Sequence, residues 1–137
     1  MKIVLATLHV RPSAQAVPLA AGCLAAALPE AQRRNCKLLD LFPEQDPDTW
    51  LEQLLENDPD LIAFPLYSWN RLPILDLARR LRQIRPAILL VAGGPEASAT
   101  PRETLEEGDF DGIILGEGEQ TWAALIEDLA AQRLPAQ

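Results

Sequence analysis

Two apolar segments of the chain end in closely spaced glycines, and these glycines are well suited to hold a ligand. Residues 88–92 (Ile-Leu-Leu-Val-Ala) run into residues 93–94 (Gly-Gly), and residues 112–115 run into residues 116–118 (Gly-Glu-Gly). Glycine has no Cβ, so it adopts positive φ angles and lets a ligand come close to the backbone. The pattern therefore favours a binding site built on backbone rather than on large side chains.

Polar and aromatic residues follow two other apolar segments in the same way. Tyr-Ser-Trp-Asn (residues 67–70) comes directly after the apolar run 61–66, and His9 follows the run 2–8. Each apolar run is short and rich in Val, Ile and Leu, which is typical of strands buried on both faces of a parallel sheet. In open parallel sheets, ligands bind outside the carboxyl ends of the strands. We therefore expect residues 9–13, 67–70, 93–98 and 116–119 to form one ligand-binding edge.

Strands and helices alternate along the whole sequence. The predicted strands are 2–8, 35–41, 61–66, 88–92 and 111–115, and the predicted helices are 14–28, 47–56, 71–85, 101–108 and 117–131. Strands joined by helical crossovers are parallel, and the crossovers are right-handed. Five such units predict an α/β protein with three layers and a flavodoxin-like (Rossmann-like) five-stranded sheet in the order 2-1-3-4-5.

The helices carry their own signals. Asp46-Pro47-Asp48 is a typical helix start, and Thr100-Pro101-Arg102-Glu103 has the pattern of a capping box. In the helix 71–85, Ile84 is expected on the buried face, and Arg79, Arg80, Arg82 and Arg85 are expected in solvent. The helix 14–28 is apolar almost all round, so a ligand, a partner or a further domain is expected to cover its outer face, which includes Ala21.

Composition and charge exclude several classes of partner. The chain has 137 residues with 20 acidic and 12 basic side chains, a net charge of −8, which argues against nucleic acid and anionic membranes. No apolar run approaches the roughly 18 residues of a membrane span. Cys23 and Cys36 lack metal-ligand spacing and suggest no disulfide framework, which favours a reducing compartment such as the cytoplasm.

Several families of protein domain share the predicted fold, so the residues in the loops must distinguish among these families. A phospho-receiver needs acidic residues after strands one and three and a lysine after strand five, where this chain has His9, Tyr67-Ser68 and Glu117. A flavodoxin needs a phosphate loop after strand one, and residues 9–13 (His-Val-Arg-Pro-Ser) make a poor anion site. A cofactor-free domain that docks a partner protein remains as an alternative.

A third module fits over nearly the whole chain, which resembles the N-terminal cobalamin-binding domain of B12-dependent radical SAM enzymes. The similar segments are residues 18–25 (Pro-Leu-Ala-Ala-Gly-Cys-Leu-Ala), 58–62 with 67–70, 93–98 (Gly-Gly-Pro-Glu-Ala-Ser) and 116–119 (Gly-Glu-Gly-Glu). The last two are the most distinctive. The resemblance implies a corrinoid-binding module that holds cobalamin for methyl transfer or a related radical reaction.

The resemblance also implies which residues bind the cofactor. They are Tyr67, Ser68, Trp69, Asn70, Gly93, Gly94, Pro95, Glu96, Gly116, Glu117 and Gly118. We expect Gly93 and Gly94 to give a flat floor, Tyr67 and Trp69 to pack on the corrin disc, and Ser68 and Asn70 to hydrogen-bond its amides or its nucleotide tail. Backbone N–H groups at residues 116–118 open a helix and meet the tail's phosphate or amides.

One departure concerns the metal. Methyl-transferring and mutase-type B12 domains carry Asp-x-His-x-x-Gly after strand one, and that His ligates cobalt. Here Thr7-Leu8-His9-Val10-Arg11-Pro12 lacks both the Asp and the Gly. We therefore expect His-off cobalamin with no metal ligand from this chain, and His9 is expected to hydrogen-bond locally.

The resemblance places the reaction outside this chain. In the family, a following barrel domain carries a Cys-x3-Cys-x2-Cys motif for a 4Fe-4S cluster that cleaves S-adenosylmethionine, and this sequence has no such motif. We expect residues 1–133 to be the cobalamin-binding domain and 134–137 to begin a linker to that missing C-terminal domain. By itself the chain is expected to catalyse nothing and to self-associate weakly.

Overall fold

The computed structural model describes residues 1–9, 19–116 and 118–133. Its centre is a sheet of parallel strands in the order β2-β1-β3-β4-β5. The strands are β1 (Ile3–Leu8), β2 (Cys36–Leu41), β3 (Leu61–Pro65), β4 (Leu89–Gly93) and β5 (Gly112–Ile113). The predicted flavodoxin-like order 2-1-3-4-5 is confirmed, although β5 is shorter than the predicted strand 111–115.

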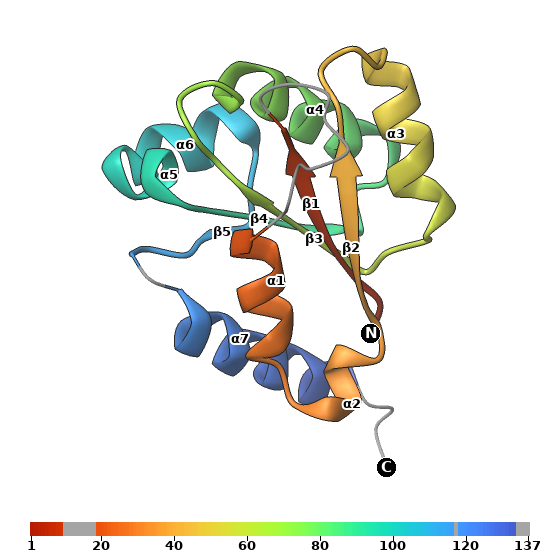
Figure 1. Ribbon diagram of the computed structural model, residues 1–137, viewed down its shortest axis with the longest axis vertical. Helices are drawn as coiled ribbons and strands as arrows, with labels where there is room; N and C mark the ends of the chain where they lie inside the picture. Colours follow the sequence, from red (N-terminus) through yellow and green to blue (C-terminus); the bar gives the residue numbers. More distant parts are fainter. Residues whose placement is uncertain (10–18, 117, 134–137) are drawn as a thin grey trace.

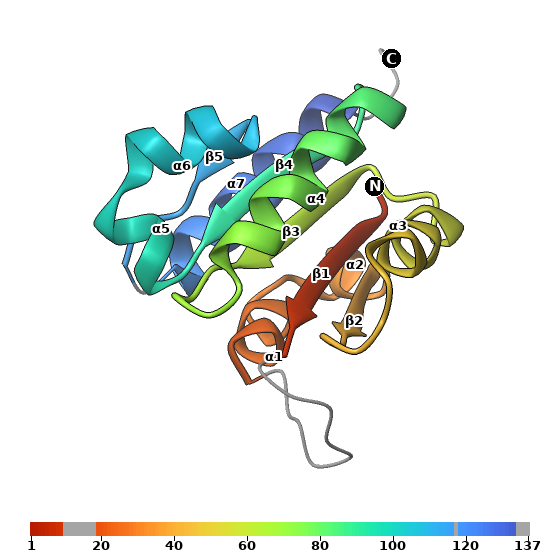
Figure 2. The same ribbon diagram turned by 90° about the horizontal axis from the view of Figure 1, so that it is seen from above.

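Helices cover both faces of this sheet, which gives three layers (Figure 1). α3 (Pro47–Glu56), α4 (Arg71–Ile84), α5 (Pro95–Ala99) and α6 (Pro101–Gly108) lie above the sheet in this view, and α1 (Leu19–Ala26), α2 (Glu30–Arg33) and α7 (Glu119–Arg133) lie below it. Seen from above, the arrowheads of β1 and β2 point to the edge at which α1 begins (Figure 2). None of the helices described has the length and apolarity needed to cross a membrane.

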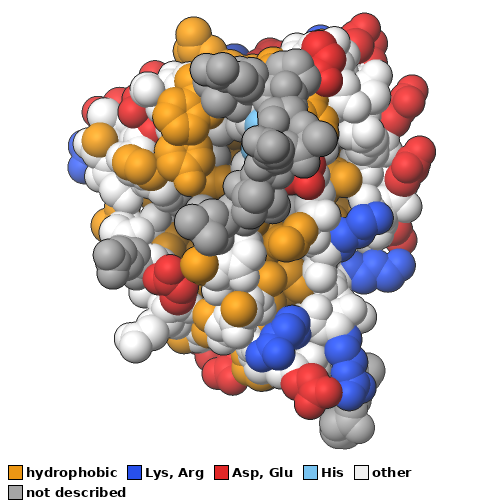
Figure 3. Space-filling view, viewed as in Figure 1, with side chains coloured by type: hydrophobic (Ala, Val, Ile, Leu, Met, Phe, Trp, Pro, Cys, Tyr) orange, Lys and Arg blue, Asp and Glu red, His pale blue; other side chains and the backbone are white. Residues whose placement is uncertain are grey.

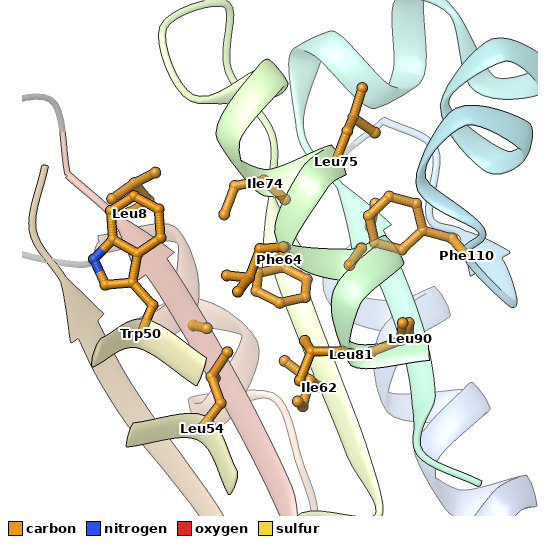
Figure 4. Close-up of a cluster of buried hydrophobic side chains, with 14 of the residues drawn as sticks. Leu8, Trp50, Leu54, Ile62, Phe64, Ile74, Leu75, Leu81, Leu90 and Phe110 are labelled. Atoms are coloured by element: carbon orange, nitrogen blue, oxygen red, sulfur yellow. The ribbon is translucent and has the colours of Figure 1, made fainter. Parts of the chain in front are cut away.

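The face under α3 and α4 holds the larger hydrophobic cluster. Alternate strand residues point to opposite faces, so Val4, Ile62 and Leu90 pack on this side with α4 residues such as Leu81. Figure 4 shows Phe64 at the centre of the cluster. Its ring meets Phe110 edge to face, with centroids 6.3 Å apart. Large side chains from both layers therefore fill this face.

The opposite face holds a smaller cluster. Ile3, Leu5 and Val91 point to this side and pack with Trp122 of α7. Trp122 is fully buried, and its indole N–H donates to the carbonyl oxygen of Leu24, 3.1 Å away. This bond joins α7 to α1 beneath the sheet.

The first helix differs from the prediction. The described part of α1 spans Leu19–Ala26, and residues 14–18 lie outside the described residues. Ala21 is 1% exposed and belongs to the core, so its expected place on an outer face is wrong. Between residues 21 and 26 of α1, the exposed side chains are Cys23 and Ala26.

The segment after β4 contains a short helix that the sequence pattern did not predict. α5 covers Pro95–Ala99, and Thr100 separates it from α6. The capping box is wrong, because the Thr100 hydroxyl makes no cap bond to α6 and donates instead to the Glu96 carbonyl oxygen at 3.4 Å. By contrast, Asp46 caps α3 as predicted, accepting the Asp48 N–H at 3.1 Å.

The α4 prediction needs two corrections. Ile84 is 50% exposed, so it is not part of the buried face. Arg79, Arg80 and Arg85 are exposed as predicted, whereas Arg82 is only 20% exposed. Arg82 donates to the Asp111 carboxylate at 2.6 Å, and the same carboxylate accepts the Leu90 N–H at 2.8 Å. Arg85 pairs with Asp58 at 3.2 Å. These ion pairs link Arg82 and Arg85 to the segments that lead into β5 and β3.

Candidate ligand-binding site

A cavity of about 450 Å3 opens at the carboxyl edge of the sheet, between the sheet and helices α1 and α7. Its floor is one row of strand residues, because Leu5 pairs with Ala63 and Ala63 pairs with Val91 in the strand register. Ala21 and Trp122 contribute walls from α1 and α7. The small side chain of Ala63 between two larger neighbours leaves the floor hollow.

The rim of the cavity brings together the two glycine segments, which begin at Gly93 and Gly116 in the sequence. Residues from both segments and from the loop after β3 line it: Tyr67, Gly93, Gly94, Pro95, Gly116 and Gly118. Backbone and small side chains dominate this rim. The polar side chains among the described lining residues are Tyr67, Cys23 and Glu119. The site therefore suits a largely apolar ligand with a few polar groups at its margin.

Glycine is required at two of these positions for different reasons. Gly94 has φ of +93°, and a Cβ there would lie 2.8 Å from the Leu66 carbonyl oxygen. That close approach follows from two bonds, Leu66 N–H to the Gly93 oxygen at 2.7 Å and Glu96 N–H to the Leu66 oxygen at 3.2 Å. At Gly118, a Cβ would collide with the Ile114 side chain. The glycines thus let the strand ends turn tightly above the cavity.

The loop after β3 is held by one buried amide. The Asn70 side chain is 1% exposed, accepts the Tyr67 N–H at 2.8 Å, and donates to the carbonyl oxygens of Leu8 and Pro65, each at 3.3 Å. It therefore ties the ends of β1 and β3 together. The predicted hydrogen bond from Asn70 to a cofactor is not tested, but these three bonds already engage its amide.

The aromatic side chains of that loop stack on each other, whereas the Asn70 amide is buried. Tyr67 and Trp69 stack with ring centroids 4.6 Å apart and planes 4° from parallel. Trp69 is 53% exposed, and Leu72 in the first turn of α4 is 76% exposed. Figure 3 shows hydrophobic side chains gathered over this loop and the start of α4. A flat aromatic platform therefore stands beside the cavity rim.

The predicted residues separate into three groups. Six of them line the cavity, as given above. Ser68, Trp69, Asn70 and Glu96 lie on the same edge but are not among the lining residues. Glu117 lies outside the described residues, as do residues 10–13 and 134–137. Cofactor binding by these residues stays a prediction.

Sequence reasoning missed the walls of the cavity. Ala21, Cys23 and Leu24 line it from α1. The signal was present, because small residues such as Ala and Gly fill this helix and leave room above the sheet. The same composition predicts an outer face, with Ala21 on it, that a ligand, a partner or a further domain covers. Ser98 lies in the predicted edge 93–98 without a role of its own there, and its hydroxyl oxygen accepts the Gly116 N–H at 3.0 Å.

His9 lies at the end of β1 and is engaged locally, as expected. Its Nε2 is 2.8 Å from the Asp40 carboxylate, and its ring stacks on Phe42 with centroids 5.2 Å apart. The part of the chain that the structure describes contains no cluster of three or more His, Cys, Asp or Glu side chains that could bind a metal.

Among the residues that the structure describes, one titratable group has a shifted pKa. Burial raises the pKa of the Cys36 thiol from 9.0 to about 11, because the low-dielectric interior disfavours the thiolate. Cys36 begins β2, the edge strand of the sheet, and packs against the smaller cluster. Neither Cys36 nor Cys23 forms a disulfide.

The fold, the order of the strands and a cavity at their carboxyl edge define a flavodoxin-like ligand-binding domain. Comparison with protein families then identifies which one. The chain matches the B12 binding domain family over residues 6–126, and it belongs to that family.

The curated relatives are much longer than this chain. It is 36% identical over 75 residues to 2-(S-pantetheinyl)-carbapenam-3-carboxylate methyltransferase of Streptantibioticus cattleyicolor, covering 53% of this chain and 11% of that protein. It is 32% identical over 99 residues to hopanoid C-3 methylase of Methylococcus capsulatus, covering 70% of this chain and 19% of that protein. The chain thus corresponds to a fifth or less of each.

The fold also matches a solved structure. The cobalamin-dependent S-adenosylmethionine radical enzyme OxsB, with aqua-cobalamin and S-adenosylmethionine bound, superposes with a TM-score of 0.71 at 17% identity. The match covers 98% of this chain and 20% of OxsB. At this identity the likeness establishes the shared fold.

Proposed function

We propose that this chain holds a cobalamin at the carboxyl edge of its sheet as the corrinoid-binding part of a radical SAM protein. The observation that carries the proposal is the apolar cavity, because its rim is formed by the two glycine segments on which the family resemblance rests. The relatives named methyltransferase and methylase support methyl transfer as the reaction class, with a related radical reaction as the wider possibility.

The size of the cavity indicates which part of the cofactor enters it. Its volume of about 450 Å3 lies toward the small end of pockets for drug-sized ligands, which range over about 300–1,000 Å3. A whole corrinoid is larger than such a ligand, so only a portion fits. The planar base of the nucleotide tail matches the apolar floor of Leu5, Ala63 and Val91.

The corrin disc then rests on the rim outside the cavity. The backbone at Gly93, Gly94 and Gly116 provides a surface without protruding side chains, which a flat ring requires. The stacked rings of Tyr67 and Trp69 offer an apolar plane beside it. Ser68 and Glu96 remain in reach of polar groups on the periphery of the disc.

The cobalt is held without a protein imidazole. His9 is the one histidine of the chain, and its Nε2 already contacts the Asp40 carboxylate. The bound cobalamin supplies a cobalt centre for methyl or radical chemistry, and this chain supplies its binding, orientation and exclusion from water. A 4Fe-4S cluster and S-adenosylmethionine belong to a further C-terminal domain, with residues 134–137 as the start of the linker.

This assignment also sets a location and a partner surface. The free thiols of Cys23 and Cys36 support a reducing compartment, and we place the protein in the cytoplasm. The exposed hydrophobic side chains of Trp69 and Leu72 are to be covered by the further domain. In its absence, they are expected to cause weak self-association.

Binding can be tested with a substitution that fills the site. Purified protein mixed with hydroxocobalamin is expected to keep its colour through gel filtration. Gly93→Leu should lower the affinity at least tenfold, because a Cβ there meets only ordinary contacts, the nearest at 3.5 Å, and its side chain blocks the rim. Gly94 is unsuitable for this test, since its positive φ would strain the fold.

Gly22→Leu is the matched control. Gly22 lies in α1 and is not among the cavity-lining residues, and a Cβ at this position would have no neighbouring atom within 4 Å. The Gly22→Leu protein should therefore retain the colour of hydroxocobalamin. A wild-type protein that elutes colourless at high cofactor concentration contradicts the proposal. That result favours the cofactor-free domain that docks a partner protein.

The metal's lower face has its own test. His9→Ala should leave the visible spectrum of the bound cobalamin unchanged and its affinity within about twofold. If the cobalt bands shift in this variant and free imidazole restores them, His9 is a ligand and the His-off assignment is wrong.

A further inference from the structure

A single side chain joins the two glycine segments of the cavity rim. The Ser98 hydroxyl oxygen accepts the backbone N–H of Gly116 at a distance of 3.0 Å. Ser98 is the last residue of the first glycine segment (residues 93–98), and Gly116 is the first residue of the second (residues 116–119). The hydrogen bond therefore links the two strand ends whose glycines line the cavity rim.

Gly116 has little else to hold it. Sheet pairing of β5 ends at Ile113, and Ile114 adds one more bond, from its N–H to the Ala92 oxygen at 2.9 Å. Within the described residues, the bond to Ser98 is the one hydrogen bond that holds Gly116 to another element. Gly116 has a φ of +65°, and a Cβ at this position would have no neighbouring atom within 4 Å. Side-chain packing therefore does not fix Gly116 either.

Ser98, by contrast, stands on a well-anchored element. Ala97 beside it is fully buried, and Glu96 donates its N–H to the Leu66 oxygen at 3.2 Å. Ser98 lies three residues after Pro95, so the two share one face of α5. Pro95 and Gly116 both line the cavity. The Ser98 hydroxyl is thereby held between α5 and the turn at Gly116.

The geometry assigns Ser98 as a positioning residue of the cofactor site, which fixes the turn at Gly116 against the nucleotide tail. This inference rests on the proposed function, in which the base of the tail enters the cavity beside that turn. Because the Ser98 oxygen acts as an acceptor, its own hydrogen is left without an acceptor among the described residues. With the cofactor bound, this hydrogen would be available to an acceptor oxygen on the ribose or phosphate of the tail.

The assignment predicts a selective loss of affinity. Ser98→Ala should weaken binding of hydroxocobalamin about three- to tenfold, the usual effect of one hydrogen bond. It should leave binding of cobinamide, a corrinoid without the nucleotide tail, unchanged within about twofold. Ser98→Thr keeps the hydroxyl and should restore the affinity for hydroxocobalamin. Absorbance titrations of the 137-residue chain measure both ligands.

Two further measurements separate this role from a structural one. Thr121→Ala removes a hydroxyl from an exposed position of α7 that does not line the cavity, and it should change neither affinity. In the free protein, the Gly116 amide should exchange its hydrogen faster in Ser98→Ala than in wild type.

The outcomes are distinct. The assignment is overturned if Ser98→Ala binds hydroxocobalamin as tightly as wild type, or if it loses the same factor for both corrinoids. Binding of neither corrinoid by wild type means that the proposed function has failed and the assignment with it. The exchange rate of the Gly116 amide then still reports whether the Ser98 bond exists.

Discussion

The two faces of the sheet are packed in different ways. Under α3 and α4, large side chains such as Phe64, Leu81 and Phe110 interlock in one continuous cluster. Beneath α1 and α7 the cluster is smaller, and a cavity of about 450 Å3 remains between Ala21 and the sheet. The same strands supply both faces, so the difference comes from which residues alternate along them and which helices cover them.

This asymmetry separates stability from binding. Protein interiors are normally close-packed, and an empty space sacrifices dispersion contacts on the side chains around it. The packed face makes contacts that hold the fold, and arginines of α4 reinforce it, as in the pair between Arg82 and Asp111. The face under α1 and α7 lacks some of these packing contacts, and the cavity there leaves room for a ligand at the strand ends.

The largest expected effect contrasts two leucines on opposite faces. Leu90 and Leu5 are both essentially fully buried in interior strands, but Leu90 lies in the packed cluster and Leu5 borders the cavity. Leu90→Ala should lower the free energy of unfolding by about 3–5 kcal/mol and Leu5→Ala by about 2 kcal/mol, because contacts around Leu5 are already incomplete. Urea denaturation measures both. Equal losses would mean that the faces are equally well packed.

The next effect concerns the amide that links the strand ends. Asn70→Ala should cost about 2–3 kcal/mol, because it leaves the buried Tyr67 N–H and two carbonyl oxygens without their partner. Asn35→Ala is the control, since the Asn35 side chain is exposed and makes one long bond of 3.4 Å. It should cost less than about 0.5 kcal/mol. A small loss for Asn70→Ala would show that the loop holds itself without this amide.

Larger side chains should also have different effects on the two faces of the sheet. Ala63→Leu projects into the cavity and should change the free energy of unfolding by less than about 1 kcal/mol while abolishing retention of hydroxocobalamin. Ala6→Leu places the same volume in the packed cluster and should cost about 1–3 kcal/mol. The comparison fails if Ala63→Leu is the more destabilising change, since the face under α1 and α7 would then have no spare room.

The smallest effect is a pH dependence on the cavity side. The pKa of Cys36 is about 11 in the folded chain, against 9.0 unperturbed, so the folded state binds more protons between these values. Stability from this thiol is present below pH 9 and is lost as pH rises toward 11, by about 1 kcal/mol because the group is only partly buried. Cys36→Ala should remove this loss, measured by denaturation at pH 8 and 11. Cys23→Ala, at an exposed position, should leave it in place.

Much of the fold could be predicted because its signals are local. The five apolar runs, the helix start at Asp46 and the parallel order all follow from periodicity and from the rules of crossover connections. The capping box at Thr100 failed because α5 precedes it and offers the Glu96 oxygen to the same hydroxyl. Ile84 failed because it is the last residue of α4, beyond the end of the buried face.

The sequence by itself determined the strand order and the positions of the glycines that form the cavity rim. Only the tertiary structure decided that Ala21 is a wall of that cavity, that the Asn70 amide is engaged by strand ends, and that Ser98 holds Gly116. The reason is physical. A strand or a turn is specified by neighbours along the chain, whereas a cavity depends on how side chains from distant elements fail to fill the space between them.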